Sequence, residues 1–349
     1  MRAGPNHFRT AWIAAFTVAI LSSQTTDFAS TRAAAQTLLR RSKVAEAIPL
    51  LERARAADPA HYENSWDLAL AYRQTNRLAR ARTLIQSMLA GGNNNKGELH
   101  NLLAEVEEAS GNTLAAAAAY QEAAHLAPRE KHIADWANHL MRYRAYDSAV
   151  KVFSSGAAMH PKSVVLRVGL GAAYYSTGDY DSAARELCAA ADLDPADLRP
   201  LDFLGQSIDV APAWNAAITQ RLERYAARFP RHPRARLYYG LSLLKLPEPQ
   251  LPAAERELRA AIAIDPRLSA AHLNLGILAE QRGEERQAIA SLERAAAVDP
   301  DLETAHYRLS RLYRKTAQPA LAARHLAAYE RLKAKPKPAA AARPALRVE

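Results

Sequence analysis

Prolines recur along this chain at nearly equal intervals, and their spacing constrains the fold more than any other feature. The separations are 34, 35, 33, 34, 35, 36 and 34 residues once Asn93 is placed in the single vacant slot. Such regularity indicates an internal repeat, in which one supersecondary unit is stacked several times. The repeat prolines are Pro59, Pro128, Pro161, Pro195, Pro230, Pro266 and Pro300.

Each repeat proline is preceded by small and large residues at fixed offsets. Ahead of Pro195, for example, small residues lie at Ala190 and Ala183, and a large one lies between them at Leu187. Offsets of three and four place these residues on one stripe of a helix, where the small ones let a neighbouring helix approach closely. Proline then ends the helix, because it has no N–H and disfavours helix in the residue before it.

A second helix is predicted ahead of this one in each unit. It carries an apolar residue followed by a small one, as in Leu170-Gly171, and an aromatic residue such as Tyr174 often follows three positions later. Turn-forming residues, such as Gly178 and Gly283, separate the two helices. The repeated unit is therefore a helix-turn-helix hairpin.

These positions resemble the signature of the tetratricopeptide repeat family, whose unit of about 34 residues carries Leu-Gly, Tyr, Ala, Phe or Tyr, Ala and Pro. The resemblance covers about nine units, from roughly residue 28 to 333. It implies an all-α, right-handed superhelical solenoid with a concave groove, which the first helices line. The best-matching unit agrees at Leu170, Gly171, Tyr174, Gly178, Tyr180, Ala183, Ala190 and Pro195.

The chain is expected to have three parts. Residues 1–29 form a signal peptide, without one clear cleavage site, and residues 30–333 form the repeat array. The array is irregular around 205–233, where IDVAPAWNAAIT replaces a short turn. Residues 334–349 form a basic tail rich in Pro and Ala, which we expect to be disordered.

The first residues predict export from the cytoplasm. A basic start with Arg2 and Arg9 precedes the apolar run AWIAAFTVAILSS. This run is shorter than the roughly 20 residues that a membrane-spanning helix needs. We therefore expect a periplasmic or secreted protein, with an uncleaved N-terminal membrane anchor as the alternative. Cys188 is the only cysteine, so an intramolecular disulfide is excluded.

The formal net charge of +10 is concentrated towards the two ends of the chain. Residues 1–35 carry a net +2 and residues 331–349 a net +5, which leaves +3 for the long stretch between them. A nucleic-acid-binding domain normally carries its basic residues on one face of the fold. The body of the chain therefore disfavours nucleic acid as a partner, while the N-terminal segment and the basic tail allow contact with a membrane.

No residue pattern points to catalysis, a cofactor or a metal. The loop GGNNNKGE lacks the G-K-[ST] order that a phosphate-binding loop requires. His125, His132 and His139 are seven residues apart but straddle a repeat boundary, so they do not share one helical face. Cys188 has no neighbouring His or Cys in the sequence to activate it. We expect a protein that is not an enzyme and that has no cofactor.

Specificity is expected in the groove. Projecting the family's inward-facing positions onto this chain gives aromatic, arginine and amide side chains, and aromatic residues and arginine are common anchors of interfaces. The lysine and asparagine with which one subfamily grips a C-terminal carboxylate are absent, since Trp66 and Leu70 stand in their places. The candidate residues are Trp66, Arg73, Asn101, Asn138, Arg142, Tyr175, Asp209, Tyr307, Arg311 and Arg314.

The sequence thus predicts a non-catalytic scaffold of the cell envelope that binds a protein or peptide in its groove, as a helix or as an extended segment. The alternative is electrostatic. In that case the basic C-terminal tail binds anionic lipid or nucleic acid, and the array only presents it.

Overall fold

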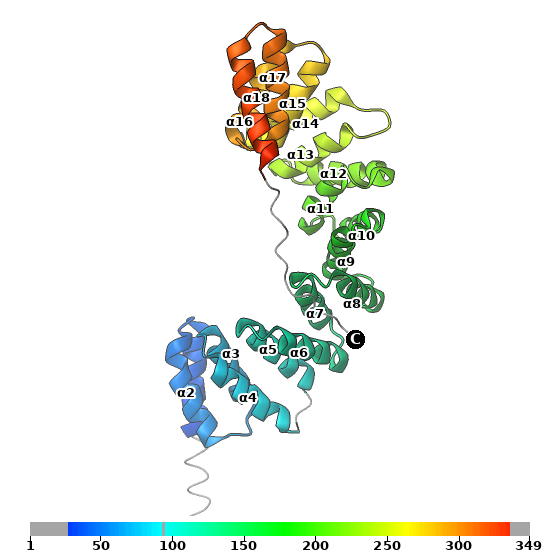
Figure 1. Ribbon diagram of the computed structural model, residues 1–349. Coiled ribbons are helices and arrows are strands. Elements are labelled where there is room, and N and C mark those ends of the chain that lie inside the picture. Colours follow the sequence, from blue (N-terminus) through cyan, green and yellow to red (C-terminus); the bar gives the residue numbers. More distant parts are fainter. Residues whose placement is uncertain (1–26, 93–94, 336–349) are drawn as a thin grey trace, which may run out of the picture. The chain divides into compact units, whose positions relative to one another are not determined.

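The structure, a computed structural model, describes residues 27–92 and 95–335 (Figure 1). Within them every regular element is a helix, and successive helices pair through short turns. The chain is an all-α helical repeat solenoid, as predicted. It divides into two compact units, one ending at Trp136 and the other beginning at Ala137.

The first unit begins with helical residues 27–40, which pair with the helix that follows them. Its remaining helices continue the alternation of first and second helices, and α7 extends across the division into the second unit. These helices are α2 (Val44–Ala57), α3 (Tyr62–Gln74), α4 (Leu78–Ala90), α5 (Lys96–Ala109), α6 (Thr113–Leu126) and α7 (Glu130–Arg142).

The second unit continues the same alternation to the end of the described residues. With the pair formed by residues 27–40 and α2, the described residues hold nine helix pairs, as the repeat count predicted. The helices are α8 (Tyr146–Met159), α9 (Val164–Thr177), α10 (Tyr180–Leu193), α11 (Arg199–Ser207), η1 (Pro212–Trp214), α12 (Asn215–Arg228), α13 (Pro233–Leu243), α14 (Leu251–Ile264), α15 (Ser269–Gln281), α16 (Glu285–Val298), α17 (Glu303–Lys315) and α18 (Pro319–Ala334).

The Asp-Pro motif that follows the second helix of several pairs has a structural reason. The N–H of Asp58 donates to the carbonyl of Ala54 (3.0 Å), and its carboxylate accepts from the N–H of Ala60 (3.1 Å). The aspartate therefore completes the last helical turn and starts the loop. The proline after it has no backbone N–H, so no donor is left without an acceptor where the helix ends. Asp194, Asp265 and Asp299 make the same pair of bonds.

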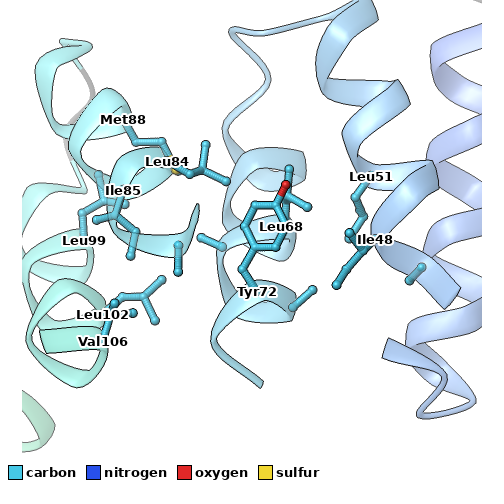
Figure 2. Close-up of a cluster of buried hydrophobic side chains, with 14 of the residues drawn as sticks. Ile48, Leu51, Leu68, Tyr72, Leu84, Ile85, Met88, Leu99, Leu102 and Val106 are labelled. Carbon is cyan, nitrogen blue, oxygen red and sulfur yellow. The ribbon is translucent and has the colours of Figure 1, made fainter. Parts of the chain in front are cut away.

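The stripes of small residues form the interior, as predicted. A large residue lies between the two small ones of each stripe and is also buried, as with Leu187 and Leu292, both 0% exposed. Figure 2 shows the corresponding core of the first unit, where Leu51, Leu68 and Ile85 come from successive helices. The alanines at the small positions that are 0% exposed are Ala47, Ala54, Ala116, Ala123, Ala149, Ala183, Ala190, Ala254, Ala261, Ala288 and Ala295.

The sixth pair departs from the regular hairpin. α11 is only nine residues long, and η1 stands between it and α12 where other pairs have a short turn. The next pair has a long connection, from the end of α13 at Leu243 to the start of α14 at Leu251. Asn215 ties the two irregularities together, because its Nδ2 donates to the carbonyl of Lys245 in that connection (3.2 Å).

Most of the predicted signal peptide, residues 1–29, and most of the basic tail, residues 334–349, lie outside the described residues. Within residues 27–92 and 95–335, no helix is both long and apolar enough to cross a bilayer.

Candidate partner-binding residues

The predicted groove residues lie almost entirely on the first helices of the pairs, as the repeat resemblance implies. Trp66 and Arg73 belong to α3, Asn101 to α5 and Tyr175 to α9. Asp209 is the exception, since it follows the end of α11. The others are Asn138 and Arg142, which are exposed on α7, and Tyr307, Arg311 and Arg314, which are exposed on α17.

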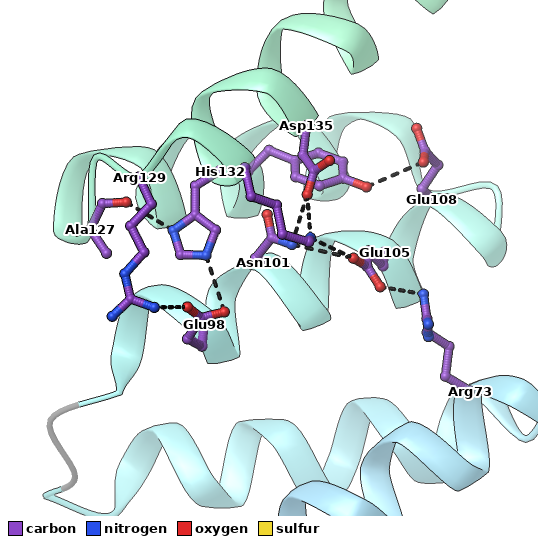
Figure 3. Close-up of polar contacts among 11 residues, drawn as sticks. Arg73, Glu98, Asn101, Glu105, Glu108, Ala127, Arg129, His132 and Asp135 are labelled. Atoms are coloured by element: carbon purple, nitrogen blue, oxygen red, sulfur yellow. Dashed lines mark hydrogen bonds and ion pairs between the residues drawn. The ribbon is translucent and has the colours of Figure 1, made fainter. Parts of the chain in front are cut away.

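Polar side chains from α3, α5 and α7 form a continuous network within the first unit (Figure 3). Arg73 pairs with Glu105, which also accepts from Asn101 Nδ2 and Lys131 Nζ, both at 3.3 Å. Asp135 accepts from Asn101 Nδ2 (3.0 Å) and from Lys131 Nζ (2.5 Å). Two predicted groove residues, Arg73 and Asn101, are therefore committed to this polar network, which consists of Arg73, Asn101, Glu105, Lys131 and Asp135.

Asn101 is the buried centre of the polar network, with only 3% of its surface exposed. Its amide nitrogen bridges two carboxylates, while its Oδ1 has no hydrogen-bond partner. Buried polar groups that lose a partner are costly, so the two bonds to Nδ2 hold this side chain inward. The structure thus places Asn101 between the helices of neighbouring pairs rather than on an open surface.

A second set of polar contacts ties α5 to the start of α7 and the loop before it. His132 is fully buried, with Nδ1 2.8 Å from the carbonyl of Ala127 and Nε2 3.2 Å from Glu98 Oε2. Glu98 also pairs with Arg129 (Figure 3). On α6, the hydroxyl of Tyr120 lies 3.3 Å from Glu108, and burial together with this carboxylate raises the pKa of Tyr120.

Three other predicted residues are also engaged within the chain. Trp66 is half-buried and packs against the core of the first unit. Tyr175 makes an edge contact with Tyr180, with ring centroids 5.1 Å apart. Asp209 forms an ion pair with Lys245 at 2.7 Å. These side chains have partners already, although the ion pair of Asp209 is solvent-exposed and weak.

The last helix pair is different, because its side chains form an exposed row of rings and cations. The Tyr307 ring, 41% exposed, lies 5.2 Å from that of Tyr329. Arg311 stands over the Tyr307 ring at 5.8 Å, and Lys333 over the Tyr329 ring at the same distance. Arg314 follows Arg311 by three residues on the same face of α17. We call Tyr307, Arg311, Arg314, Tyr329 and Lys333 the terminal cluster.

A comparison with family models supports the repeat assignment. The model described as tetratricopeptide repeat matches residues 38–106 and 140–205. These two stretches of the chain carry tetratricopeptide repeats. The matched residues include all or most of α2 to α5 in the first unit and α8 to α10 in the second.

One solved structure with a TM-score above 0.5 has the same fold, and others are similar over about half of this chain. The C-terminal part of a TPR repeat-containing protein from Cytophaga hutchinsonii is 15% identical, covers 78% of this chain and 96% of its own, and has a TM-score of 0.51. YrrB, described as a TPR protein with an unusual peptide-binding site, is 19% identical over 55% of this chain and 98% of its own (TM-score 0.46). A thermophilic TPR protein from Thermus thermophilus is 22% identical over 50% of this chain and 93% of its own (TM-score 0.40). The curated proteins contain no match.

The terminal cluster includes two residues, Tyr329 and Lys333, that were not among the predicted groove residues. Tyr329 takes the place that Ala295 has in the preceding tetratricopeptide repeat, 34 residues earlier. Ala295 is fully buried, whereas Tyr329 is half-exposed and carries its ring to Tyr307. The available signal was a large residue at a small-residue position, with a lysine four residues later on the same helical face.

The net positive charge of the described residues falls on the same pair of helices. Residues 27–302 carry 33 basic and 33 acidic side chains and are formally neutral. Residues 303–335, which contain α17 and α18, carry eight basic and two acidic side chains, a formal +6. The excess positive charge near the C-terminal end therefore begins on α17 and α18, ahead of the basic tail. The cations of this pair that form no ion pair within the described residues are Arg311, Arg314, Arg324, Arg331 and Lys333.

Cys188 and the histidine pair of the last two helices lie in structural surroundings. Cys188 is 3% exposed, and burial raises the pKa of its thiol to about 11, which disfavours the reactive thiolate. His306 and His325 face each other through their Nδ1 atoms at 3.0 Å, and burial is the main cause that lowers the pKa of His325. In the part of the chain that the structure describes, no group of three or more His, Cys, Asp or Glu side chains is placed to hold a metal ion.

A cavity of about 450 Å³ lies in the first unit, between the end of α2, the start of α3 and the end of α4. Its lining includes Arg55, Tyr62, Ser65 and Ser87, and none of the predicted groove residues borders it.

Proposed function

We propose that this tetratricopeptide repeat protein is a non-catalytic scaffold, and that it binds a protein or peptide partner through the terminal cluster on α17 and α18. The repeat fold supports the general role of protein binding. The binding surface is assigned to this cluster because Tyr307, Arg311 and Arg314 are exposed and have no acidic partner within the described residues. Aromatic and arginine side chains are the residues most often found to dominate binding energy at protein interfaces.

The other predicted groove residues support this choice by contrast. A partner that bound Arg73 or Asn101 would first have to break contacts inside the polar network. Removing a buried charge or amide from its partners is expensive unless equivalent bonds replace them. Binding at the terminal cluster requires no such exchange, so more of its contact energy remains available for affinity.

We further propose that the scaffold acts in the cell envelope, as a periplasmic or secreted protein. This proposal rests on the basic start and apolar run of residues 1–29, which have the composition of a signal peptide.

The proposed function is tested by affinity capture from an envelope extract, followed by identification of the captured protein and measurement of its affinity. We expect Tyr307→Ala to weaken binding by at least about 10-fold, because the variant removes an exposed aromatic anchor. The fold should remain intact, since the Tyr307 side chain is outside the buried core.

Arg324→Ala is the matched control for the companion variant Arg311→Ala. Both arginines are exposed and unpaired in the last helix pair, but Arg324 is not part of the terminal cluster. Wild-type affinity in Tyr307→Ala and Arg311→Ala, with the partner identified, would contradict the assignment of the binding surface.

A further inference from the structure

The terminal cluster combines positive charge with aromatic surface in one continuous row. Its order is Lys333, Tyr329, Tyr307 and Arg311, with neighbouring members in ring–ring or cation–ring contact at 5.2 to 5.8 Å. Arg314 extends the row by one helical turn along α17. Two cations thus stand over the two tyrosine rings and a third, Arg314, follows on the same helix, and none of the three forms an ion pair with an acidic side chain of the described residues.

The chemistry of this row selects an anionic ligand. A guanidinium group presents a planar set of N–H donors that matches a carboxylate, and such charge-assisted bonds are stronger than neutral ones. The tyrosine rings add apolar contact area and hydroxyl groups between the cations. Because residues 27–302 are formally neutral, the net positive charge of the described residues comes from residues 303–335, which contain the last helix pair.

We propose that the terminal cluster binds a segment of the partner protein that is rich in Asp and Glu. The inference rests on the proposed function, because it assigns a chemical class to the ligand of the same surface. Carboxylates of the segment pair with Arg311, Arg314 and Lys333, and its apolar groups lie on the two tyrosine rings.

An acidic protein segment fits the arrangement better than an anionic membrane does. Arg324 and Arg331 are seven residues apart and share one side of α18, whereas Tyr329 lies about 140° around the helix from Arg324. A flat bilayer therefore meets only one of these two groups of cations at a time. Each basic residue near an anionic surface strengthens attachment roughly fivefold, and stable membrane binding takes two anchoring signals.

Because the terminal cluster and the pair Arg324 and Arg331 lie on different sides of α18, they can be compared with a matched pair of variants. The double variant Arg311→Glu/Lys333→Glu reverses two charges of the terminal cluster. The double variant Arg324→Glu/Arg331→Glu changes the net charge of the chain by the same amount on a different side of α18. A long-range effect of net charge would act equally in both variants, whereas a local site responds to only the first.

The test uses the full chain and a fluorescein-labelled peptide that alternates glutamate and alanine, with fluorescence anisotropy as the readout. The control peptide has glutamine in place of every glutamate. We expect the acidic peptide to bind at least about 10-fold more tightly than the control, because only carboxylates pair with the cations. Arg311→Glu/Lys333→Glu should abolish this preference, and Arg324→Glu/Arg331→Glu should retain most of it. Raising NaCl from about 50 to about 500 mM should weaken binding, since the Debye length then falls to a few ångströms.

Three results would overturn the inference. The first is equal binding of the acidic and the glutamine peptides. The second is an equal loss of affinity in the two charge-reversal variants, which would indicate net charge rather than a site. The third is binding to vesicles that contain phosphatidylglycerol, through Arg311 and Lys333, in the absence of binding to the acidic peptide.

The outcome separates this inference from the proposed function. If the captured partner depends on Tyr307 but is not displaced by the acidic peptide, the scaffold and its surface stand and the acidic ligand is wrong. If the acidic peptide binds at the cluster while the captured partner is insensitive to Tyr307→Ala, the ligand chemistry stands and the assignment of the partner's binding surface is wrong.

Discussion

Gly276 on α15 shows how a single residue sets the distance between the two helices of a pair. A Cβ atom at this position would lie 2.7 Å from Leu292 Cγ and 3.3 Å from the carbonyl of Ala288. Both contacts are closer than ordinary van der Waals distance, and Leu292 is fully buried. The absence of a side chain therefore lets α15 rest directly on α16.

We expect Gly276→Ala to destabilise the protein by about 1 to 2 kcal/mol, because overpacking outweighs the better helix propensity of alanine. Gly92→Ala is the control, since a Cβ there would meet no atom within 4 Å. The free energy of unfolding, measured by urea denaturation, should fall in the first variant and stay constant or rise slightly in the second. Equal stability of the two variants would contradict this role for Gly276.

Single residues also show which parts of the fold and site the sequence could predict. Burial of Ala183, Ala190 and Leu187 follows from spacing along one helix, which is a local property and was predicted correctly. The pairing of Arg73 with Glu105 joins residues 32 positions apart, and it depends on how the two side chains meet after neighbouring pairs have stacked. A groove position in a repeat signature predicts which face of the helix carries a side chain. It does not predict which charged residue of a neighbouring pair will form an ion pair with that side chain.

At the scale of elements, the irregular sixth and seventh pairs share an apolar core and are also linked by a buried hydrogen bond. Asn215 at the start of α12 is 6% exposed, and its bond to the carbonyl of Lys245 fixes the connection between α13 and α14. The sequence indicated that this region was irregular. It did not indicate the bond, because the two residues lie 30 positions apart.

We expect Asn215→Ala to lower the free energy of unfolding by about 1 kcal/mol and to increase amide exchange in residues 244–250. The comparison is Asp209→Ala, which removes the exposed ion pair to the same lysine and should change stability by less than about 0.5 kcal/mol. Mass-spectrometric hydrogen exchange on the two variants distinguishes a buried hydrogen bond from a surface ion pair. The same exchange profile in both variants would argue against the stated role of Asn215.

At the scale of the whole molecule, the array consists of two compact units, each stabilised by contacts between successive helices. In repeat proteins, stability is approximately a sum over repeats and their nearest neighbours, so unfolding can be regional. A substitution that destabilises one repeat is then expected to lower the local stability of its neighbours more than that of distant repeats.

We expect Ile85→Ala, which removes a fully buried side chain from α4, to cost about 2 to 5 kcal/mol locally. Amide exchange should accelerate in the helices from α2 to α5 and remain unchanged from α15 to α18. Leu292→Ala in α16 is the reciprocal variant, with the opposite distribution expected. Acceleration along the entire array in either variant would show that the chain unfolds as one cooperative body.

The uneven charge of the chain has a kinetic consequence. A formally neutral stretch of 276 residues is followed by a helix pair of formal charge +6, in which the cations of the terminal cluster form no ion pair within the described residues. An acidic partner approaching by diffusion is attracted there first, and this attraction raises the rate of encounter more than it slows dissociation. The unpaired cations of the terminal cluster therefore have two effects. They contact the bound partner, and they also direct its first encounter with the chain to α17 and α18.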